Sequence, residues 1–122
     1  MTAVETMFKA FMEAALWSST WDDGDGNGEL PLDKKYTIAD FDQKDLDYLK
    51  GQVIEFLNLN KTMIGDELEK AGHEFWLTRN HHGAGFWDGD WEEQKGIALT
   101  NACRRFKEVS IYPATDGKLY II

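Results

Sequence analysis

Apolar residues near the start of the chain recur at the spacing of an amphipathic helix. Val4, Met7, Phe8, Phe11 and Ala15 stand three or four residues apart and would line one helix face. This pattern predicts a helix over residues 3–17. The glycine-rich acidic stretch of residues 22–31 that follows is typical of a loop.

Two further helices are expected in the middle of the chain. Asp42, with Asp45 three residues later, forms a capping pattern, and an apolar stripe follows it. The stripe consists of Leu46, Leu49, Val53 and Phe56 or Leu57. The pattern ends at Asn58, and a short third helix is predicted over residues 62–71, with Gly72 as its left-handed stop.

From residue 73 onward the period of the pattern changes to two. Residues 74–79 alternate so that Phe75 and Leu77 share a face, which predicts a strand, and Phe86 begins a returning strand after a tight turn. A helix is expected over residues 96–107. The closing hairpin is predicted from the two strands at residues 109–112 and 118–122 and the Asp-Gly turn between them.

These elements predict an α+β fold: three N-terminal helices packed with a small antiparallel sheet of two β-hairpins separated by a helix. The length of 122 residues fits a single domain, residues 1–122. The sequence begins without the basic and apolar regions of a leader and has no apolar stretch of about 20 residues. With its single cysteine, Cys103, the chain is expected in the cytoplasm, away from membranes.

Charge gives the first indication of function. The net charge is −9, and residues 22–47 hold nine acids and three lysines. Such a field repels nucleic acid and attracts a basic surface, so we expect a protein partner and no direct nucleic-acid binding. A second acidic segment, residues 88–93, contains four acids and no basic residue. Tryptophan often dominates protein interfaces, and Trp87 and Trp91 stand beside and within this segment. The predicted partner-binding residues are Asp22, Asp23, Asp25, Asp42, Asp45, Trp87, Asp88, Asp90, Trp91, Glu92 and Glu93.

A second candidate site is the predicted hairpin, with Arg79, His81, His82 and Asp88. On paired strands the arginine and the aspartate would form an ion pair or face a ligand together. A metal site that combines His73, His81 or His82 with Asp88 or Asp90 has little support. Adjacent histidines point apart on extended backbone, and no ligand-type spacing is present, so we expect no metal here.

Other reactive patterns are incomplete. Asp23, Asp25 and Asn27 match the opening of a calcium loop, but the twelfth position is Lys34, so only a loose surface calcium stays open. Cys103 falls on the inner face of a predicted helix, where cysteine packs as a small hydrophobe. No serine has the Gly-x-Ser-x-Gly context of a nucleophile. We therefore predict no catalytic residue and no cofactor.

Residues 72–80 read GHEFWLTRN and residues 83–88 read GAGFWD. They resemble a signature of small uncharacterised proteins from tailed bacteriophages and prophages, which reads GHDFWLTRNGHGAGFWDR. Residues 15–18, 32–34 and 116–118 are also similar to that family. His81 stands where those proteins have glycine, and Gly89 where they have arginine. The resemblance implies a phage-encoded, non-virion protein of the host cytoplasm and no established activity.

Charge and resemblance together predict a phage accessory protein. It would bind and modulate or inhibit a host protein, such as a nucleic-acid-handling or defence enzyme, through an acidic surface that carries aromatic residues. One alternative is a metal-dependent enzyme of phage nucleic-acid metabolism that uses the hairpin of residues 79–90. Another alternative is a small assembly or structural factor. The identity of the partner and the oligomeric state are left open.

Overall fold

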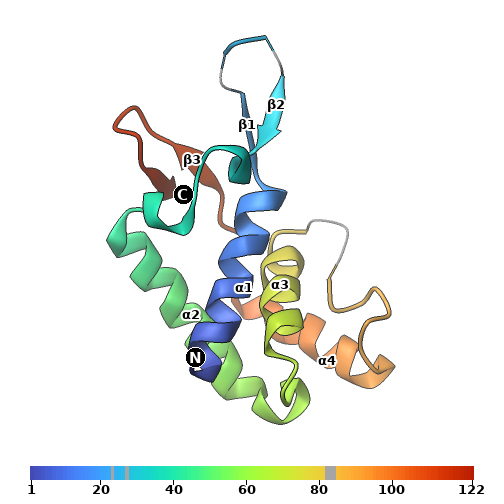
Figure 1. Ribbon diagram of the computed structural model, residues 1–122. Coiled ribbons are helices and arrows are strands. Elements are labelled where there is room, and N and C mark those ends of the chain that lie inside the picture. The colour runs from blue at the N-terminus through green and yellow to red at the C-terminus, as the bar shows by residue number, and fades with distance from the viewer. Residues whose placement is uncertain (23, 27, 82–84) are drawn as a thin grey trace.

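The protein folds as four α-helices and two short β-hairpins in the part of the chain that the computed structural model describes, residues 1–22, 24–26, 28–81 and 85–122 (Figure 1). In chain order the elements are α1 (Ala3–Ser18), β1 (Thr20–Asp22), β2 (Glu29–Pro31), α2 (Gln43–Ile64), α3 (Leu68–Arg79), α4 (Glu93–Ala102), β3 (Ile111–Pro113) and β4 (Leu119–Ile121). Single 3-10 turns occupy Leu32–Lys34, Ile38–Asp40 and Cys103–Arg105. The predicted α+β class is confirmed.

Helices α1 and α3 pack against each other at the centre, and α2 runs obliquely past them and contacts both (Figure 1). Gly72 permits the close approach of α1 and α3, because a Cβ atom there would collide with the backbone carbonyl of Met7 and touch Ala10. The prediction that Gly72 ends a helix is therefore wrong. The helix end is at Gly65, which caps α2 with a φ of 59°.

The strand predicted over residues 74–79 is a helix. Along α3, Ala71, Gly72, Phe75, Trp76 and Arg79 are all buried and follow the three-and-four spacing of a helix. Leu77 and Thr78 are buried as well, so α3 is enclosed on nearly all sides and its apolar run lacks a clear period. Residues 85–90 form turns and bends, so the described residues contain no hairpin around residue 80.

Aromatic side chains fill the space between the helices. Phe75 stacks on Phe56 of α2 with ring centres 4.1 Å apart, and Phe86 stacks on the same Phe56 at 5.8 Å. Phe106, after α4, meets Phe75 edge-on at 4.9 Å. Trp76 is buried, and its indole donates to Ser18 Oγ at 2.8 Å, which ties α3 to the end of α1. The core thus draws on every helix and on the loop after α3.

Helix α2 is longer than predicted and includes residues 62–64, the start of the proposed third helix, whereas residues 68–71 belong to α3. Asp42 caps its start as expected, because the Asp42 side chain accepts from the backbone NH of Asp45 at 3.4 Å. Asn60 has non-helical backbone angles, but its buried side chain donates to the carbonyl of Phe56. The chain therefore kinks at Asn60 and continues as helix to Ile64. The separate helix over residues 62–71 is wrong.

Two hairpins lie at the end of the molecule where α1 finishes (Figure 1). The β3–β4 hairpin is confirmed, with Ile111 opposite Ile121 and a turn at Gly117 with a φ of 86°. The β1–β2 hairpin was not predicted; it brackets the acidic loop and projects from the helices, with Trp21 opposite Leu30. The two hairpins form separate two-stranded sheets in place of one. The predicted helix over residues 96–107 is α4 with the 3-10 turn that follows it.

None of the helices in residues 1–22, 24–26, 28–81 and 85–122 is long and apolar enough to cross a membrane.

Candidate functional site

Three carboxylates converge where the loop after α3 folds back on that helix. Glu74 comes from α3, and Asp88 and Asp90 come from the loop before α4. One oxygen of each lies within 4.8 Å of the other two. We call Glu74, Asp88 and Asp90 the carboxylate cluster.

Glycine and threonine seat the loop on the helix. A Cβ atom at Gly85 would collide with the hydroxyl of Thr78 on α3, so only glycine permits this approach. The Thr78 hydroxyl accepts from the backbone NH of Phe86 at 3.2 Å, and the NH of Gly85 donates to Asp88 Oδ2 at 3.3 Å. Phe86 is buried between Phe56 and the Trp91 ring. The loop is therefore fixed by core packing as well as by hydrogen bonds.

Glu74 is the buried member of the carboxylate cluster. Glu74 is only 6% exposed, and within the described part of the chain its Oε2 atom has no hydrogen-bond partner. Burial, the charge of Asp88 and a hydrogen bond with the Asp90 side chain raise the pKa of Glu74 to about 7. A pair of carboxyl groups shares a hydrogen bond only while one holds a proton, so the cluster needs a positive charge to be stable.

Lys70 lies close enough to the carboxylate cluster for its charge to oppose the rise in the pKa of Glu74. Its ammonium donates to the backbone carbonyl of Asp90 at 2.6 Å and to Glu67 Oε1 at 3.1 Å, and it lies 4.3 Å from the centre of the Trp91 ring. These contacts fasten the loop to the start of α3. They also direct the ammonium to Glu67, so it forms no direct ion pair with Glu74 among the described residues.

The candidate hairpin site does not form. Arg79 is 2% exposed, and its guanidinium donates to the carbonyl of Lys107, at 3.0 Å from Nε, and to Gln52. Burial lowers the pKa of Arg79 to about 10. The expected pair of Arg79 with Asp88 is therefore wrong, because the arginine faces the chain after α4 and the aspartate faces Glu74.

His81 joins neither the carboxylate cluster nor the contacts of Arg79. His81 is exposed, adopts a φ of 56° and contacts Glu108 Oε1 at 3.1 Å from Nε2. His82 lies outside the described residues. The structure thus places Arg79, His81 and Asp88 in three different surroundings. These three side chains do not form the common site that the alternative of a hairpin enzyme requires.

The predicted partner-binding residues divide into exposed and structural ones. Asp22, Asp25, Trp87 and Glu93 are exposed, and Asp23 lies outside the described residues. Asp42 caps α2, and Asp45 accepts from the backbone NH of Ile121 at 3.0 Å, so both are partly occupied in the fold. Glu92 caps α4 by accepting from the NH groups of Gln94 and Lys95.

Trp91 is not an interface anchor. It is 7% exposed and meets Phe86 edge-on with ring centres 5.5 Å apart, whereas Trp87 is 49% exposed. The two acidic segments also lie apart: the β1–β2 hairpin is at one end of the molecule, and the loop of residues 85–92 lies beside α4 (Figure 1). They do not form one acidic surface.

A cleft of about 590 Å³ is lined by residues from the end of α3 and from the chain around the 3-10 turn after α4. Residues that line it include His81, Trp87, Cys103, Arg104, Lys107 and Glu108. Burial raises the pKa of the Cys103 thiol to about 12, so the thiol stays protonated at neutral pH and is a poor nucleophile. The prediction that Cys103 packs as a small hydrophobe agrees with its burial.

Comparisons of the chain with protein-family models, with curated proteins and with solved structures found no match. The carboxylate cluster was missed from sequence because Glu74 was assigned to a strand. The sequence does contain a signal, because Glu74 stands directly before the apolar run Phe75, Trp76 and Leu77. An acid within an apolar segment is expected to be buried, and buried acids often have a specific role.

Proposed function

We propose that this protein binds a basic surface of another protein and modulates that protein's activity. The binding face is what we call the acidic end, the two hairpins and the start of α2. Its exposed acids are Asp22, Asp25, Glu29, Asp33, Asp47 and Asp116. The resemblance to bacteriophage proteins supports a host protein as the partner and the host cytoplasm as the location. A host enzyme that handles nucleic acid has a basic surface of the required kind.

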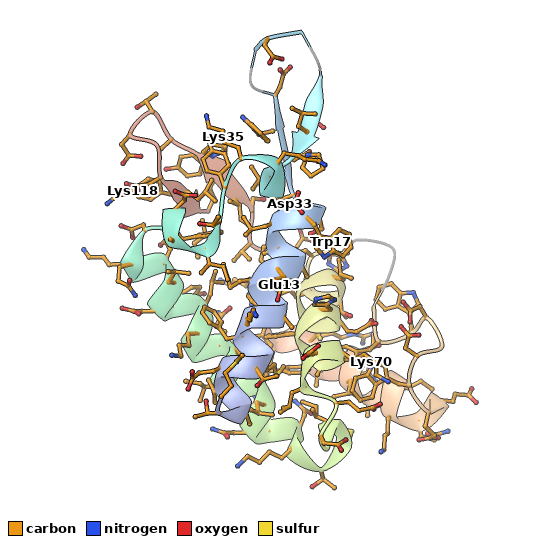
Figure 2. All side chains as sticks on the ribbon, in the orientation of Figure 1. Glu13, Trp17, Asp33, Lys35, Lys70 and Lys118 are labelled. Carbon is orange, nitrogen blue, oxygen red and sulfur yellow. The ribbon has the colours of Figure 1, made fainter. Side chains whose placement is uncertain are left out.

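The observation that carries the proposal is the excess of acidic over basic side chains at the acidic end. The ion pairs within the described part of the chain are Lys70–Glu67, His81–Glu108 and Arg105–Glu55. None of them involves Asp22, Glu29 or Asp33. The lysines at this end, such as Lys35 and Lys118, are outnumbered by the acids (Figure 2). A field of this sign accelerates association with a basic partner.

Aromatic residues at the same end provide apolar contact area. Tyr112 is 43% exposed and stacks on Tyr120 with ring centres 5.8 Å apart. The Tyr120 hydroxyl donates to Asp116 Oδ2 at 2.6 Å, which lowers the pKa of Asp116 and keeps it ionised. Charge and aromatic surface are thus adjacent on the β3–β4 hairpin, as protein interfaces often require.

The test is capture of a partner from host lysate, followed by measurement with the purified pair. Two variants of equal net charge are compared. The test variant neutralises the projecting hairpin, with the substitutions Asp22→Asn, Asp25→Asn and Glu29→Gln. The control variant neutralises exposed acids at the opposite end, with the substitutions Glu5→Gln, Asp66→Asn and Glu69→Gln.

We expect the hairpin variant to weaken association about tenfold or more, mainly through a slower association rate, and the control variant to change it little. Raising the salt concentration should weaken binding of the wild type more than binding of the hairpin variant, because exposed charges are screened within about 8 Å at physiological ionic strength. Equal losses in both variants, or direct binding of DNA by the wild type at that ionic strength, would contradict the proposal.

A further inference from the structure

The carboxylate cluster concentrates negative charge without an ammonium or guanidinium bound to it. Three carboxyl groups with oxygens within 4.8 Å of one another repel strongly when all are ionised. Lys70 is the nearby cation, and its hydrogen bonds go to Glu67 and to the Asp90 backbone carbonyl. A further positive charge would therefore stabilise this part of the fold.

Glu74 supplies an observation that is independent of the acidic composition. The residue is 6% exposed and its Oε2 atom has no hydrogen-bond partner among the residues that the structure describes, which is unusual for a buried carboxylate oxygen. The other two members, Asp88 and Asp90, are exposed and lie on the same loop. The geometry is therefore a buried carboxylate at the base with two accessible carboxylates above it, through which an ion can enter from solvent.

We propose that Glu74, Asp88 and Asp90 bind a hard divalent cation of the size of calcium. Carboxylate oxygens are the ligands that calcium, magnesium and manganese prefer, and the cluster contains no sulfur or imidazole ligand that would favour zinc or copper. Calcium–oxygen distances are about 2.3–2.6 Å, so oxygens on opposite sides of one ion are separated by about 5 Å. The oxygens of the cluster lie within that limit, so the three carboxylates can reach one ion together.

The loop is built to hold its ligands in this arrangement. Asp88 and Asp90 flank Gly89, which has a φ of 102° and sets the turn between them. Contacts of Phe86 with the core and of Lys70 with the Asp90 carbonyl hold the loop at both ends. Cation binding would tie this loop to α3, and the partner-binding surface proposed for the acidic end is not involved.

The competing source of positive charge is a proton. In that arrangement Glu74 stays protonated near neutral pH and donates to Asp90, and the cluster serves only the fold. The two alternatives give opposite results with a cation, because a proton held by Glu74 does not produce stoichiometric, ligand-dependent binding of metal.

The experiment is titration of calcium, magnesium and manganese into the chelator-treated full chain, by calorimetry and by thermal unfolding at several cation concentrations. Terbium(III), which replaces calcium and luminesces when a nearby tryptophan transfers energy to it, reports the location, because Trp91 directly follows Asp90. We expect one calcium per chain, a rise of several degrees in melting temperature and sensitised terbium emission.

Glu74→Gln and Asp88→Asn should each weaken calcium binding by at least about tenfold. Asp88→Asn is the safer of the two, because Asp88 is exposed and its replacement leaves the core intact. Glu93→Gln is the matched control from the same segment, and Asp25→Asn is the control for the acidic loop. Absence of stoichiometric binding for all of these cations would overturn the proposal. Binding that Asp25→Asn abolishes, and that Glu74→Gln and Asp88→Asn leave unchanged, would also overturn it.

Discussion

The two acidic regions of this protein have similar composition and different physical states. At the acidic end, Asp22 and Glu29 are exposed on a projecting hairpin, where water solvates each charge. In the carboxylate cluster, Glu74 is buried against the core and its pKa is raised to about 7. Acidic residues therefore produce a long-range electrostatic field at the acidic end. In the carboxylate cluster the same residue types need a proton or a cation nearby to be stable.

The difference shows that acidity alone identifies no site. Solvated acids influence the rate at which a charged partner arrives and contribute little to stability. A buried acid opposes folding unless a proton or a cation compensates it.

The burial of Glu74 depends on α3 being a helix of the core. Phe75 is fully buried and contacts Phe56 and Phe106, so Phe75→Ala should lower the free energy of unfolding by about 3–5 kcal/mol. Tyr112→Ala at the acidic end, where the ring is 43% exposed, should lower it by no more than about 1 kcal/mol. Urea unfolding of both variants is the measurement, and similar losses would show that α3 is not central.

Arg79 tests whether the buried charge at the end of α3 is structural. Arg79→Ala leaves the Lys107 carbonyl and Gln52 without their donor and opens space beside Phe75, so we expect a loss of roughly 2–4 kcal/mol in unfolding free energy. Arg79→Lys should recover only part of it, because an ammonium lacks the planar fork of guanidinium donors.

Arg104→Ala is the control for Arg79, since Arg104 is exposed on the wall of the cleft. It should change the unfolding free energy by no more than about 0.5 kcal/mol. If Arg79→Ala were as well tolerated as Arg104→Ala in chemical denaturation, Arg79 would be available for a ligand after all.

Glu74 should make stability depend on pH. Its folded pKa of about 7 lies above the ordinary value of 4.5, so the folded state holds the proton more tightly than the unfolded state. Its contribution to stability is therefore fully present below pH 4.5 and is lost as the pH rises through about 7. Glu74→Gln removes this loss and should be more stable than the wild type above neutral pH, by at most roughly 3 kcal/mol.

The measurement for Glu74 is urea unfolding from pH 4 to 8 with chelator present, so that no cation compensates the carboxylates. Glu93→Gln, an exposed acid in the first turn of α4, is the control and should follow the wild-type profile. Parallel profiles for wild type and Glu74→Gln would mean that the carboxylate is solvated, and the contrast between the two acidic regions would disappear.

The hairpin acids should have the smallest effect on stability. Asp22→Asn and Glu29→Gln should each change the unfolding free energy by no more than about 0.5 kcal/mol, because both side chains are exposed. Their expected effect is on the association rate with a basic partner, measured by stopped-flow mixing at increasing salt concentration. A loss of stability comparable with that of Arg79→Ala would show that these acids serve the fold.

Local signals in the sequence predicted much of the fold. The period of the first fifteen or so residues, the Asp42 cap and the Asp116-Gly117 turn each depend on neighbouring residues, and α1, the start of α2 and the β3–β4 hairpin follow them. The candidate sites were less predictable. The exposure of Asp22, Asp25 and Trp87 was expected, whereas the burial of Trp91 and Arg79 was not.

Composition and neighbouring residues predicted the net charge, the starts of α1 and α2 and the turn at Gly117, because these depend on composition or on residues within one helical turn of each other. The helix at residues 74–79 could be recognised only from the tertiary structure, because this apolar run is enclosed on nearly all sides and lacks a clear period. Gly72 makes the enclosure possible, since it leaves room for α1. The carboxylate cluster also forms only through tertiary contacts. Glu74 and Asp90 are sixteen positions apart and meet only because Gly85 lets the loop return against Thr78, a contact that no local pattern encodes.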